Sequence, residues 1–446
     1  MVDLLIIGAG PGGYEAALEA RKNNLSVTMI DDNAIGGTCL HVGCIPSKTM
    51  HHIAETMRGM RQLTQMGMKV ELEPFSLEPL WMNKDKVVQT LTDDITALLK
   101  AAQVNMVFGR ATLVDAHTVE VNGEKIEATN ILLATGSRAV RPNIPGINLP
   151  GVVDSTTLLS LTKLPEHLIV IGGGYIGLEW ATIFSALGSE VSIVEFMPTL
   201  LPSADEDIAK RIAVLAKRDG INLHLSTAVS SIEKIDGRLI VNMDTPTPVA
   251  INGDVVLVAT GRKPNIEMLN LNQVKVDYSP NGIRVNNVLQ TSVESIYAIG
   301  DCIGAPMLAH KASFQGKQVV AHIAHRHLDI DFAAIPSVVF SFPEIASVGL
   351  TEAEVKLKGI IYETKRIPLR SNGKAVANGE TDGFLKVILD PDKKLLGAHI
   401  ICAQANTLIS ELALMYHLGR PLTEYTGVIH VHPTLSEIVQ TLLQSL

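Results

Sequence analysis

With 446 residues, the chain is long enough for about three domains of roughly 150 residues each. Its 46% hydrophobic and 19% charged residues are typical of a globular protein and argue against a disordered one. A net charge of −9 without a long basic run, and the lack of an apolar run of about 18 residues, predict no nucleic-acid partner and no membrane partner.

The N-terminal segment predicts the strand, turn and helix of a dinucleotide-binding fold. A short apolar run, residues 3–7, opens through Gly8, Gly10 and Gly13 into a helical pattern. Gly8 would make the tight turn, Gly10 would let a pyrophosphate approach the backbone, and Gly13 would let helix and strand pack closely. A second strand ends at Asp31, whose carboxylate could bind ribose hydroxyls or could be a solvated turn residue; we favour ribose binding.

Two cysteines five residues apart, Cys39 and Cys44, come next. A zinc site would normally have a second pair of ligands at short spacing, whereas Cys302 and Cys402 stand alone, so we expect a redox-active disulfide and no metal. In a regular helix residues i and i+5 have Cα atoms about 8.6 Å apart, and a disulfide tolerates about 7 Å at most. If the pair bridges, the helix must be distorted there. The alternative is two thiols at a helix start that never pair.

A second copy of the glycine pattern, with Gly172, Gly174 and Gly177, lies between two further strands. Two such units predict two bound dinucleotides. The strand after the second unit ends at Glu195, whose charge favours a free 2′-hydroxyl and repels a 2′-phosphate. The sequence therefore predicts NAD and not NADP as the second nucleotide.

Other apolar runs end in glycine turns that would close the two sheets, at Gly136 and at Gly261. The run at 295–301 places Asp301 after Gly300, where a carboxylate could meet the ribityl or phosphate part of a flavin. A strand end without any function would have the same sequence pattern. The prediction of nucleotide contacts therefore rests on the order in which these segments follow one another.

The remaining segments predict a helical excursion and a C-terminal domain. We expect helix over about 49–102, with apolar positions three and four apart at 81–99. Strands at 337–340, 384–389 and 396–401, followed by a helix from Ala405, predict an α+β arrangement.

The motifs, in this order, resemble those of the disulfide-containing flavoprotein reductases over essentially the whole chain, and among them the dihydrolipoamide dehydrogenases most. The motifs that match are GAGPGGY (8–14), GGTCLHVGCIPSK (36–48), GGGYIGLE (172–179), YAIGDCIGAPMLAHKAS (297–313), FPEIASVGLTEAE (342–354) and HPTLSE (432–437).

The resemblance implies the roles of the reacting residues. Cys44 would be the thiol facing the flavin, and Cys39 would exchange with the substrate disulfide. His432 would be the acid and base, with Glu437 orienting its imidazole. Pro433 would start a helix, placing His432 at its mouth and Glu437 about one and a half turns along. In this family the HPTLSE segment comes from the partner subunit, which implies a homodimer.

The resemblance also implies cofactor contacts. Lys48 and Glu179 would pair near the flavin ring, and Tyr175 would cover the nicotinamide pocket. Other candidate contacts in the matching motifs are Gly37, Thr38, Gly300, Asp301 and Ala309, and the glycine turns at Gly136 and Gly261 are further candidates. Two positions depart from the family pattern. Residues 402–405 (CAQA) replace a GPGA-like stretch, and His41 replaces a common asparagine, which would either shift thiolate stability or be a surface change without effect.

The expected fold is α/β, with two Rossmann-like dinucleotide-binding domains and a C-terminal α+β dimerisation domain. We expect an FAD-binding domain at 1–141, completed by about 290–320, an NAD-binding domain at 142–264, a central domain at 265–334 and a dimerisation domain at 335–446.

The activity implied is the oxidation of dihydrolipoamide through the Cys39–Cys44 disulfide and FAD, with NAD⁺ reduced to NADH. The lipoyl group would come on the acyltransferase of a 2-oxoacid dehydrogenase complex or on a glycine cleavage protein. Two alternative functions remain. One is that of a glutathione-type or mercuric reductase, and the other is that of a flavin-binding redox sensor without disulfide turnover. Four cysteines and a first strand that starts at once predict a cytoplasmic protein without a signal peptide.

Overall fold

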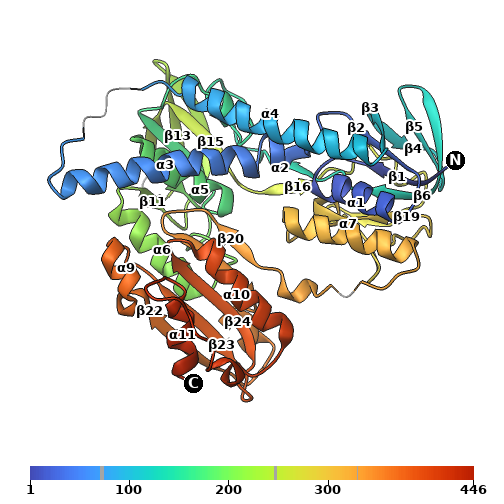
Figure 1. The fold of residues 1–446 in the computed structure, drawn as a ribbon. Helices are drawn as coiled ribbons and strands as arrows, with labels where there is room; N and C mark the ends of the chain where they lie inside the picture. The colour runs from blue at the N-terminus through green and yellow to red at the C-terminus, as the bar shows by residue number, and fades with distance from the viewer. Residues whose placement is uncertain (71–74, 246–248, 329) are drawn as a thin grey trace.

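The computed structural model describes residues 1–70, 75–245, 249–328 and 330–446. Two α/β domains lie next to each other, and a C-terminal domain lies below the second one in the view of Figure 1. Among the described residues, no helix has both the length and the apolar character needed to cross a membrane.

The first domain is built on a parallel sheet whose strands are buried on both faces, as apolar runs such as residues 4–7 require. Its order is β3 (Asn105–Phe108), β2 (Val27–Asp31), β1 (Val2–Ile7), β6 (Glu124–Leu133) and β19 (Ile296–Ala298). The first half of β6 continues into an antiparallel extension with β5 (Thr118–Val121) and β4 (Ala111–Leu113).

Helices α1 (Pro11–Lys22) and α7 (Ala309–Ile323) cross one face of this sheet in close contact. Glycine makes the approach possible, because a Cβ added to Gly316 would lie 2.6 Å from the carbonyl oxygen of Gly12. Residues of the expected central domain, such as Ile266 and Ile283, pack in the same core as Leu5. The domain boundaries stay a prediction, and this packing joins the part after residue 265 to the first domain.

The second domain repeats the parallel arrangement. Its sheet order is β11 (Asn222–His224), β10 (Glu190–Val194), β9 (His167–Ile171), β15 (Val255–Val258) and β8 (Val152–Val153). Helices α5 (Tyr175–Leu187) and α6 (Glu206–Arg218) flank it, with an antiparallel sheet of β12 (Ala228–Ile235), β13 (Arg238–Asp244) and β14 (Val249–Gly253). Strands β7 (Ser137–Ala139) and β16 (Arg262–Pro264) pair at the crossover between the domains.

Two long helices, α3 (Cys44–Gln65) and α4 (Glu78–Ala101), run together across the upper part of Figure 1. They account for the expected helical excursion, although α3 starts at Cys44 and not at Thr49. Residues 71–74 of that excursion lie outside the described residues. Because α3 also packs on α5, it ties the first domain to the second.

The C-terminal domain is an antiparallel sheet ordered β20 (Ser337–Val339), β21 (Glu344–Gly349), β24 (Leu395–Cys402), β23 (Phe384–Leu389) and β22 (Glu363–Pro368). Helices α10 (Ala405–Leu418) and α11 (Glu437–Gln444) pack on the sheet, and α8 (Glu352–Leu357) and α9 (Gly373–Asn378) are short. At the departure from the family pattern, Cys402 is buried in the core and Gln404 has a left-handed φ of 60°, a conformation that glycine adopts readily.

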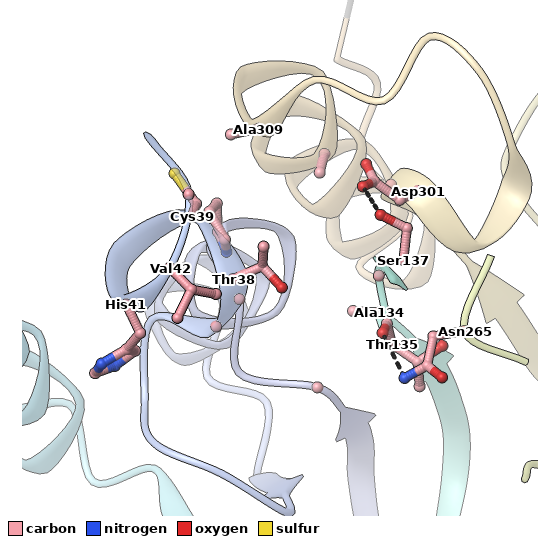
Figure 2. A pocket seen from close by; sticks show the side chains of 18 of the residues that line it. Thr38, Cys39, His41, Val42, Ala134, Thr135, Ser137, Asn265, Asp301 and Ala309 are labelled. Carbon is pink, nitrogen blue, oxygen red and sulfur yellow. Dashed lines mark hydrogen bonds between the residues drawn. The ribbon is translucent and has the colours of Figure 1, made fainter. Parts of the chain in front are cut away.

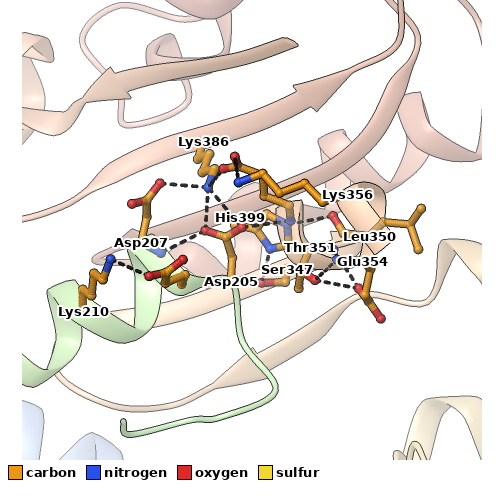
Figure 3. Close-up of polar contacts among 12 residues, drawn as sticks. Asp205, Asp207, Lys210, Ser347, Leu350, Thr351, Glu354, Lys356, Lys386 and His399 are labelled. Atoms are coloured by element: carbon orange, nitrogen blue, oxygen red, sulfur yellow. Dashed lines mark hydrogen bonds and ion pairs between the residues drawn. The ribbon is translucent and has the colours of Figure 1, made fainter. Parts of the chain in front are cut away.

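A buried ion cluster joins α6 to the C-terminal sheet (Figure 3). The side chain of Lys386 on β23 is only 3% exposed, and its Nζ lies 2.9 Å from Asp205, 2.8 Å from Asp207 and 2.7 Å from Glu352. Burial acts to lower the pKa of Lys386, but the hydrogen bonds to these carboxylates outweigh burial and raise it. Asp205 also caps α6 by accepting from the amide of Asp207.

Candidate active site

The two glycine turns have the same geometry. Gly8 and Gly172 have φ of 111° and 109°, and an added Cβ would lie 2.3 Å and 2.5 Å from the carbonyl oxygens of Ala134 and Ala259. Only glycine allows this conformation and this close approach of the neighbouring strand.

The second and third glycines of each turn differ in what surrounds them. A Cβ added to Gly10 or Gly174 would meet nothing within 4 Å, so the space beside each backbone is open at the N-terminus of α1 or α5. A Cβ added to Gly13 would instead lie 1.8 Å from the oxygen of Gly8, which shows how tightly helix and strand pack. Open space beside helix N-terminal amides is the geometry that receives a pyrophosphate.

A cavity of about 880 Å³ runs along the first turn and reaches the second domain. The sequence-predicted residues that line it are Gly8, Gly10, Asp31, Gly37, Thr38, Cys39, Cys44, Lys48, Gly136, Tyr175, Glu179, Gly300, Asp301 and Ala309. Figure 2 shows Thr38 and Cys39 on one side and Ser137 and Asp301 on the other, with Ala309 at the top of the view. The other predicted residues, Gly13, Gly172, Gly174, Gly177, Glu195, Gly261, His432 and Glu437, are not part of its lining.

In each dinucleotide-binding domain, an acidic residue at the end of the strand that follows the glycine-turn helix is hydrogen-bonded to that glycine turn. Asp31 accepts from the amide of Ala9 at 2.6 Å, and Glu195 accepts from the amide of Gly173 at 2.5 Å. Burial raises the pKa of Asp31 although this hydrogen bond acts against it. Each carboxylate oxygen keeps a second lone pair, so ribose binding stays a prediction that this geometry permits.

The helix breaks between the two cysteines. Cys39 lies in α2 (Gly37–His41) and Cys44 begins α3, with Val42 and Gly43 in non-helical conformations between them. Gly43 is needed here, since an added Cβ would lie 2.9 Å from the carbonyl oxygen of Thr38. The regular helix that would hold the sulfurs apart is therefore absent between these residues, and the two free thiols shift each other's pKa.

The two thiols differ strongly in acidity. The hydrogen bond from Cys39 lowers the pKa of Cys44 to about 7; burial opposes this shift, and the Lys48 ammonium adds to it. The same hydrogen bond and burial raise the pKa of Cys39. Cys44 is thus the thiol that ionises first, and thiolates are the reactive form of cysteine.

Lys48 and Glu179 meet where all three domains join. Lys48 Nζ lies 2.9 Å from Glu179 Oε2 and 4.2 Å from the centre of the Phe340 ring. Glu179 Oε1 accepts from the amide of Phe340 at 3.0 Å. The Glu179 carboxylate on α5 is therefore held by Lys48 of α3 and by the amide of Phe340, which follows the first strand of the C-terminal sheet.

The sequence did not single out Arg262 or Ser137 as site residues. Arg262 donates to Ser137 Oγ at 2.7 Å, and Ser137 Oγ donates to Asp301 Oδ2 at 2.5 Å (Figure 2). Burial lowers the pKa of Arg262, although the nearby carboxylate of Asp301 acts against it. The one sequence signal for Arg262 is its place directly after Gly261 at the end of an apolar run.

Tyr175 and His41 both line the cavity. Tyr175 is 42% exposed at the start of α5 and is hydrogen-bonded to Ser203 at 3.1 Å. His41 Nε2 lies 2.8 Å from the carbonyl oxygen of Ile35, so its imidazole is tied to the main chain and not to either thiol.

His432 and Glu437 form a pair in the C-terminal domain. His432 Nδ1 lies 2.9 Å from Glu437 Oε1, and Glu437 Oε2 accepts from the amide of Thr434 at 2.8 Å. The hydrogen bond from His432 and then that from Thr434 lower the pKa of Glu437. The His432 side chain is 79% exposed, and α11 lies well away from α2 within the chain (Figure 1).

The predicted helix start at Pro433 is wrong. Helix α11 begins at Glu437, so this carboxylate lies in the first turn and not one and a half turns along. The reason is that Glu437 folds back onto Thr434 and His432, and an acidic side chain is favoured at a helix N-terminus.

Comparison with known proteins identifies the class. Residues 2–316 match the pyridine nucleotide-disulphide oxidoreductase family, and residues 335–443 match the dimerisation domain of that family. The chain therefore belongs to the pyridine nucleotide-disulphide oxidoreductases, which confirms the resemblance and the fold class expected from the sequence.

Similar individual proteins point in the same direction. Dihydrolipoyl dehydrogenase 2 of Haloarcula marismortui is 38% identical over 450 residues, 98% of this chain and 95% of that protein. Dihydrolipoyl dehydrogenase of Geobacillus stearothermophilus is 38% identical over 444 residues, 98% and 94% of the two chains. The crystal structure of LpdA from Mycobacterium tuberculosis has a TM-score of 0.92 and 27% identity, over 100% and 99% of the chains. RclA from Escherichia coli, an HOCl-induced flavoprotein disulfide reductase, has a TM-score of 0.89, 28% identity and 99% coverage of both chains.

The chain is thus a flavoprotein disulfide oxidoreductase that uses FAD and NAD. The cavity fits the flavin nucleotide, because the open side of Gly10 can receive its pyrophosphate and the cavity then extends past Asp301 to both cysteines. The open turn at Gly174 offers the same cradle for NAD.

Proposed function

We propose that the protein oxidises dihydrolipoyl groups carried by a partner protein and passes the electrons to NAD⁺. The observation that carries this proposal is the thiol pair on the cavity wall, in which Cys44 has a pKa of about 7 and Cys39 a raised one. The dihydrolipoyl dehydrogenases that match almost the whole chain support the choice of substrate.

The lowered pKa of Cys44 supports the order of disulfide exchange that we propose. A thiolate of the dihydrolipoyl group attacks Cys39 Sγ of the Cys39–Cys44 disulfide, and Cys44 leaves as the thiolate because the thiol of lower pKa is the better leaving group. The second dihydrolipoyl thiolate then attacks the mixed disulfide, which releases lipoyl disulfide and the Cys39 thiolate, so two electrons have moved to the cysteine pair.

His432 would accept the protons that these thiols lose, with Glu437 holding the imidazole through Nδ1. Because neither residue lines the cavity of its own chain, we propose that a homodimer completes each site with the partner's His432. Lys48 would stabilise the Cys44 thiolate, and bound FAD would supply the electron transfer between the dithiol and NAD.

We propose a preference for NAD over NADP because of the residues that follow β10. The negative charge of Glu195 would repel a 2′-phosphate, and residues 195–204 contain no lysine or arginine to hold one. The lipoylated partner is proposed to be the acyltransferase of a 2-oxoacid dehydrogenase complex or a glycine cleavage protein. A reducing compartment, the cytoplasm, suits a protein with four cysteines and a reducible pair.

A substrate comparison tests the proposal. The purified holoenzyme should use NADH with lipoamide far better than NADPH with glutathione disulfide, and the reverse preference would assign a glutathione-type reductase. Stepwise reduction separates the sensor alternative: a long-wavelength charge-transfer band after two electrons is expected, and its absence would favour a flavin protein without disulfide turnover.

A further inference from the structure

A second hollow, of about 390 Å³, lies between α6 and the outer strand of the C-terminal sheet. It is lined by Arg211 from α6, Arg366 from β22 and Arg370 from the turn that follows, together with Pro368, Thr381 and Gly383. Among the described residues, no carboxylate side chain is part of this lining. Three guanidinium groups therefore converge in a chain whose net charge is −9.

Two of these guanidinium groups are positioned by contacts, and all three keep free donors. The Arg366 guanidinium carbon lies 3.7 Å from the centre of the buried Phe384 ring, which fixes its plane and leaves its N–H edges open. In the part of the chain that the structure describes, the side chains of Arg366 and Arg370 form no hydrogen bond or ion pair. Arg211 uses one amino group on Asp382 Oδ1 at 2.8 Å.

The nearest carboxylate does not balance the charge. Asp382 binds Arg211 and is shared with Arg218, also on α6. Like charges that converge repel each other, and solvent weakens this repulsion without removing it. An anion with several oxygens would relieve the repulsion and accept paired N–H bonds from more than one guanidinium, as phosphate does.

We infer that the hollow binds a phosphate group, either as free phosphate or as the phosphate of a small metabolite. Its volume is in the range of small-molecule sites. It is separate from both glycine turns, since no residue of either turn is in its lining. Because Arg211 belongs to the second domain and the other two arginines to the C-terminal domain, the anion would bridge the two.

Binding is measured on the FAD-loaded protein by calorimetry, with inorganic phosphate in one arm and ADP in the other. Sodium chloride at the same ionic strength is the control for screening. Saturable phosphate binding is expected, and it should weaken at least tenfold in Arg370→Gln and in the Arg366→Gln/Arg370→Gln double variant. Arg420→Gln, an exposed arginine on the loop after α10, is the matched control and should bind as the parent does.

The outcomes separate the sources and the alternatives. Tighter binding of ADP than of phosphate, lost in the same variants, would assign a phosphorylated metabolite; equal or weaker binding would assign free phosphate. Displacement of phosphate by NAD⁺ would place the anion at the Gly174 turn and overturn the inference. An effect that chloride reproduces, or binding that the Arg370→Gln protein retains in full, would overturn it as well. Arg370 has no side-chain partner among the described residues, so this variant is expected to fold.

Discussion

Lys48 Nζ lies 2.9 Å from Glu179 Oε2, and the two residues come from different dinucleotide-binding domains. The pair acts on Cys44 with opposite signs, because the ammonium lowers the pKa of that thiol and the carboxylate raises it. The position of one domain relative to the other thus contributes to the pKa of a reactive cysteine, next to the larger effects of Cys39 and of burial.

The first prediction concerns this balance. Lys48→Met should raise the pKa of Cys44 above its value of about 7, and Glu179→Gln should lower it. The rate at which iodoacetamide alkylates Cys44 of the reduced protein, followed against pH, measures the change. A shift of the same sign in both variants would contradict the assigned roles.

The second prediction separates the hydrogen bond from the redox chemistry. Cys39→Ala removes the largest cause of the low Cys44 pKa and should raise it, whereas Cys39→Ser keeps a donor and should leave it closer to about 7. Neither variant can form the disulfide, so both should lose lipoamide turnover. The same alkylation profile for the two variants would show that the hydrogen bond is unimportant.

The third prediction concerns His432. His432→Gln should reduce lipoamide turnover by about 10²-fold to 10⁴-fold, the usual contribution of general acid–base catalysis. A mixed dimer of Cys39→Ala and His432→Gln subunits should regain one intact site if the histidine acts across the dimer. No recovery on mixing would place Cys39 and His432 of the same chain in one site.

The fourth prediction uses the matched glycine turns. Gly10→Ala adds a methyl group that meets no protein atom but enters the cradle, so the protein should fold and lose affinity for FAD. Gly174→Ala should leave FAD bound and weaken NAD binding. Flavin retention on gel filtration and the KM for NAD⁺ are the measurements, and loss of flavin from Gly174→Ala would contradict the assignment of the two turns.

The fifth prediction concerns the buried ion cluster. Lys386→Met should destabilise the protein by about 3 kcal/mol, because it leaves Asp205 buried without its cation while two other carboxylates reach solvent. Lys210→Met removes an exposed partner of Glu206 and should change stability by less than about 0.5 kcal/mol. Chemical denaturation of both variants checks the difference.

The same ion cluster makes the free energy of unfolding depend on pH. The pKa of Glu352 is lowered to about 2, first by Lys356 and then by Lys386, and that of Asp205 is lowered as well. Carboxylates with a lowered folded pKa contribute stability above their unfolded pKa and lose it as the pH falls. Unfolding free energy should therefore drop between about pH 4.5 and pH 2, and less steeply in Lys386→Met.

Local sequence patterns predicted those features of the structure that depend on residues close together in the chain. The glycine turns at Gly8 and Gly172 could be predicted because the positive φ of each turn is a local requirement, although the strands that approach them, at Ala134 and Ala259, are distant in sequence. The spacing of Cys39 and Cys44 also showed that a regular helix could not bring the sulfurs together, and the structure breaks the helix between them.

Contacts that are distant in sequence could not be predicted in this way. Lys386 meets Asp205 across 181 residues, and Arg262 meets Ser137 across 125 residues, so no periodicity links either pair. At Pro433 a local signal for a helix start was overruled, because the Glu437 carboxylate satisfies the amide of Thr434 and places the start of α11 four residues later.

The acidity of Cys44 has a consequence for proton coupling. Below about pH 7, reduction of the Cys39–Cys44 disulfide would take up two protons with two electrons, whereas above it only Cys39 would take one. The midpoint potential of the couple should then fall by about 59 mV per pH unit on the acidic side and by about 30 mV on the alkaline side. The midpoint potential, and with it the driving force for electron delivery, would therefore respond to pH about twice as steeply below neutrality as above it.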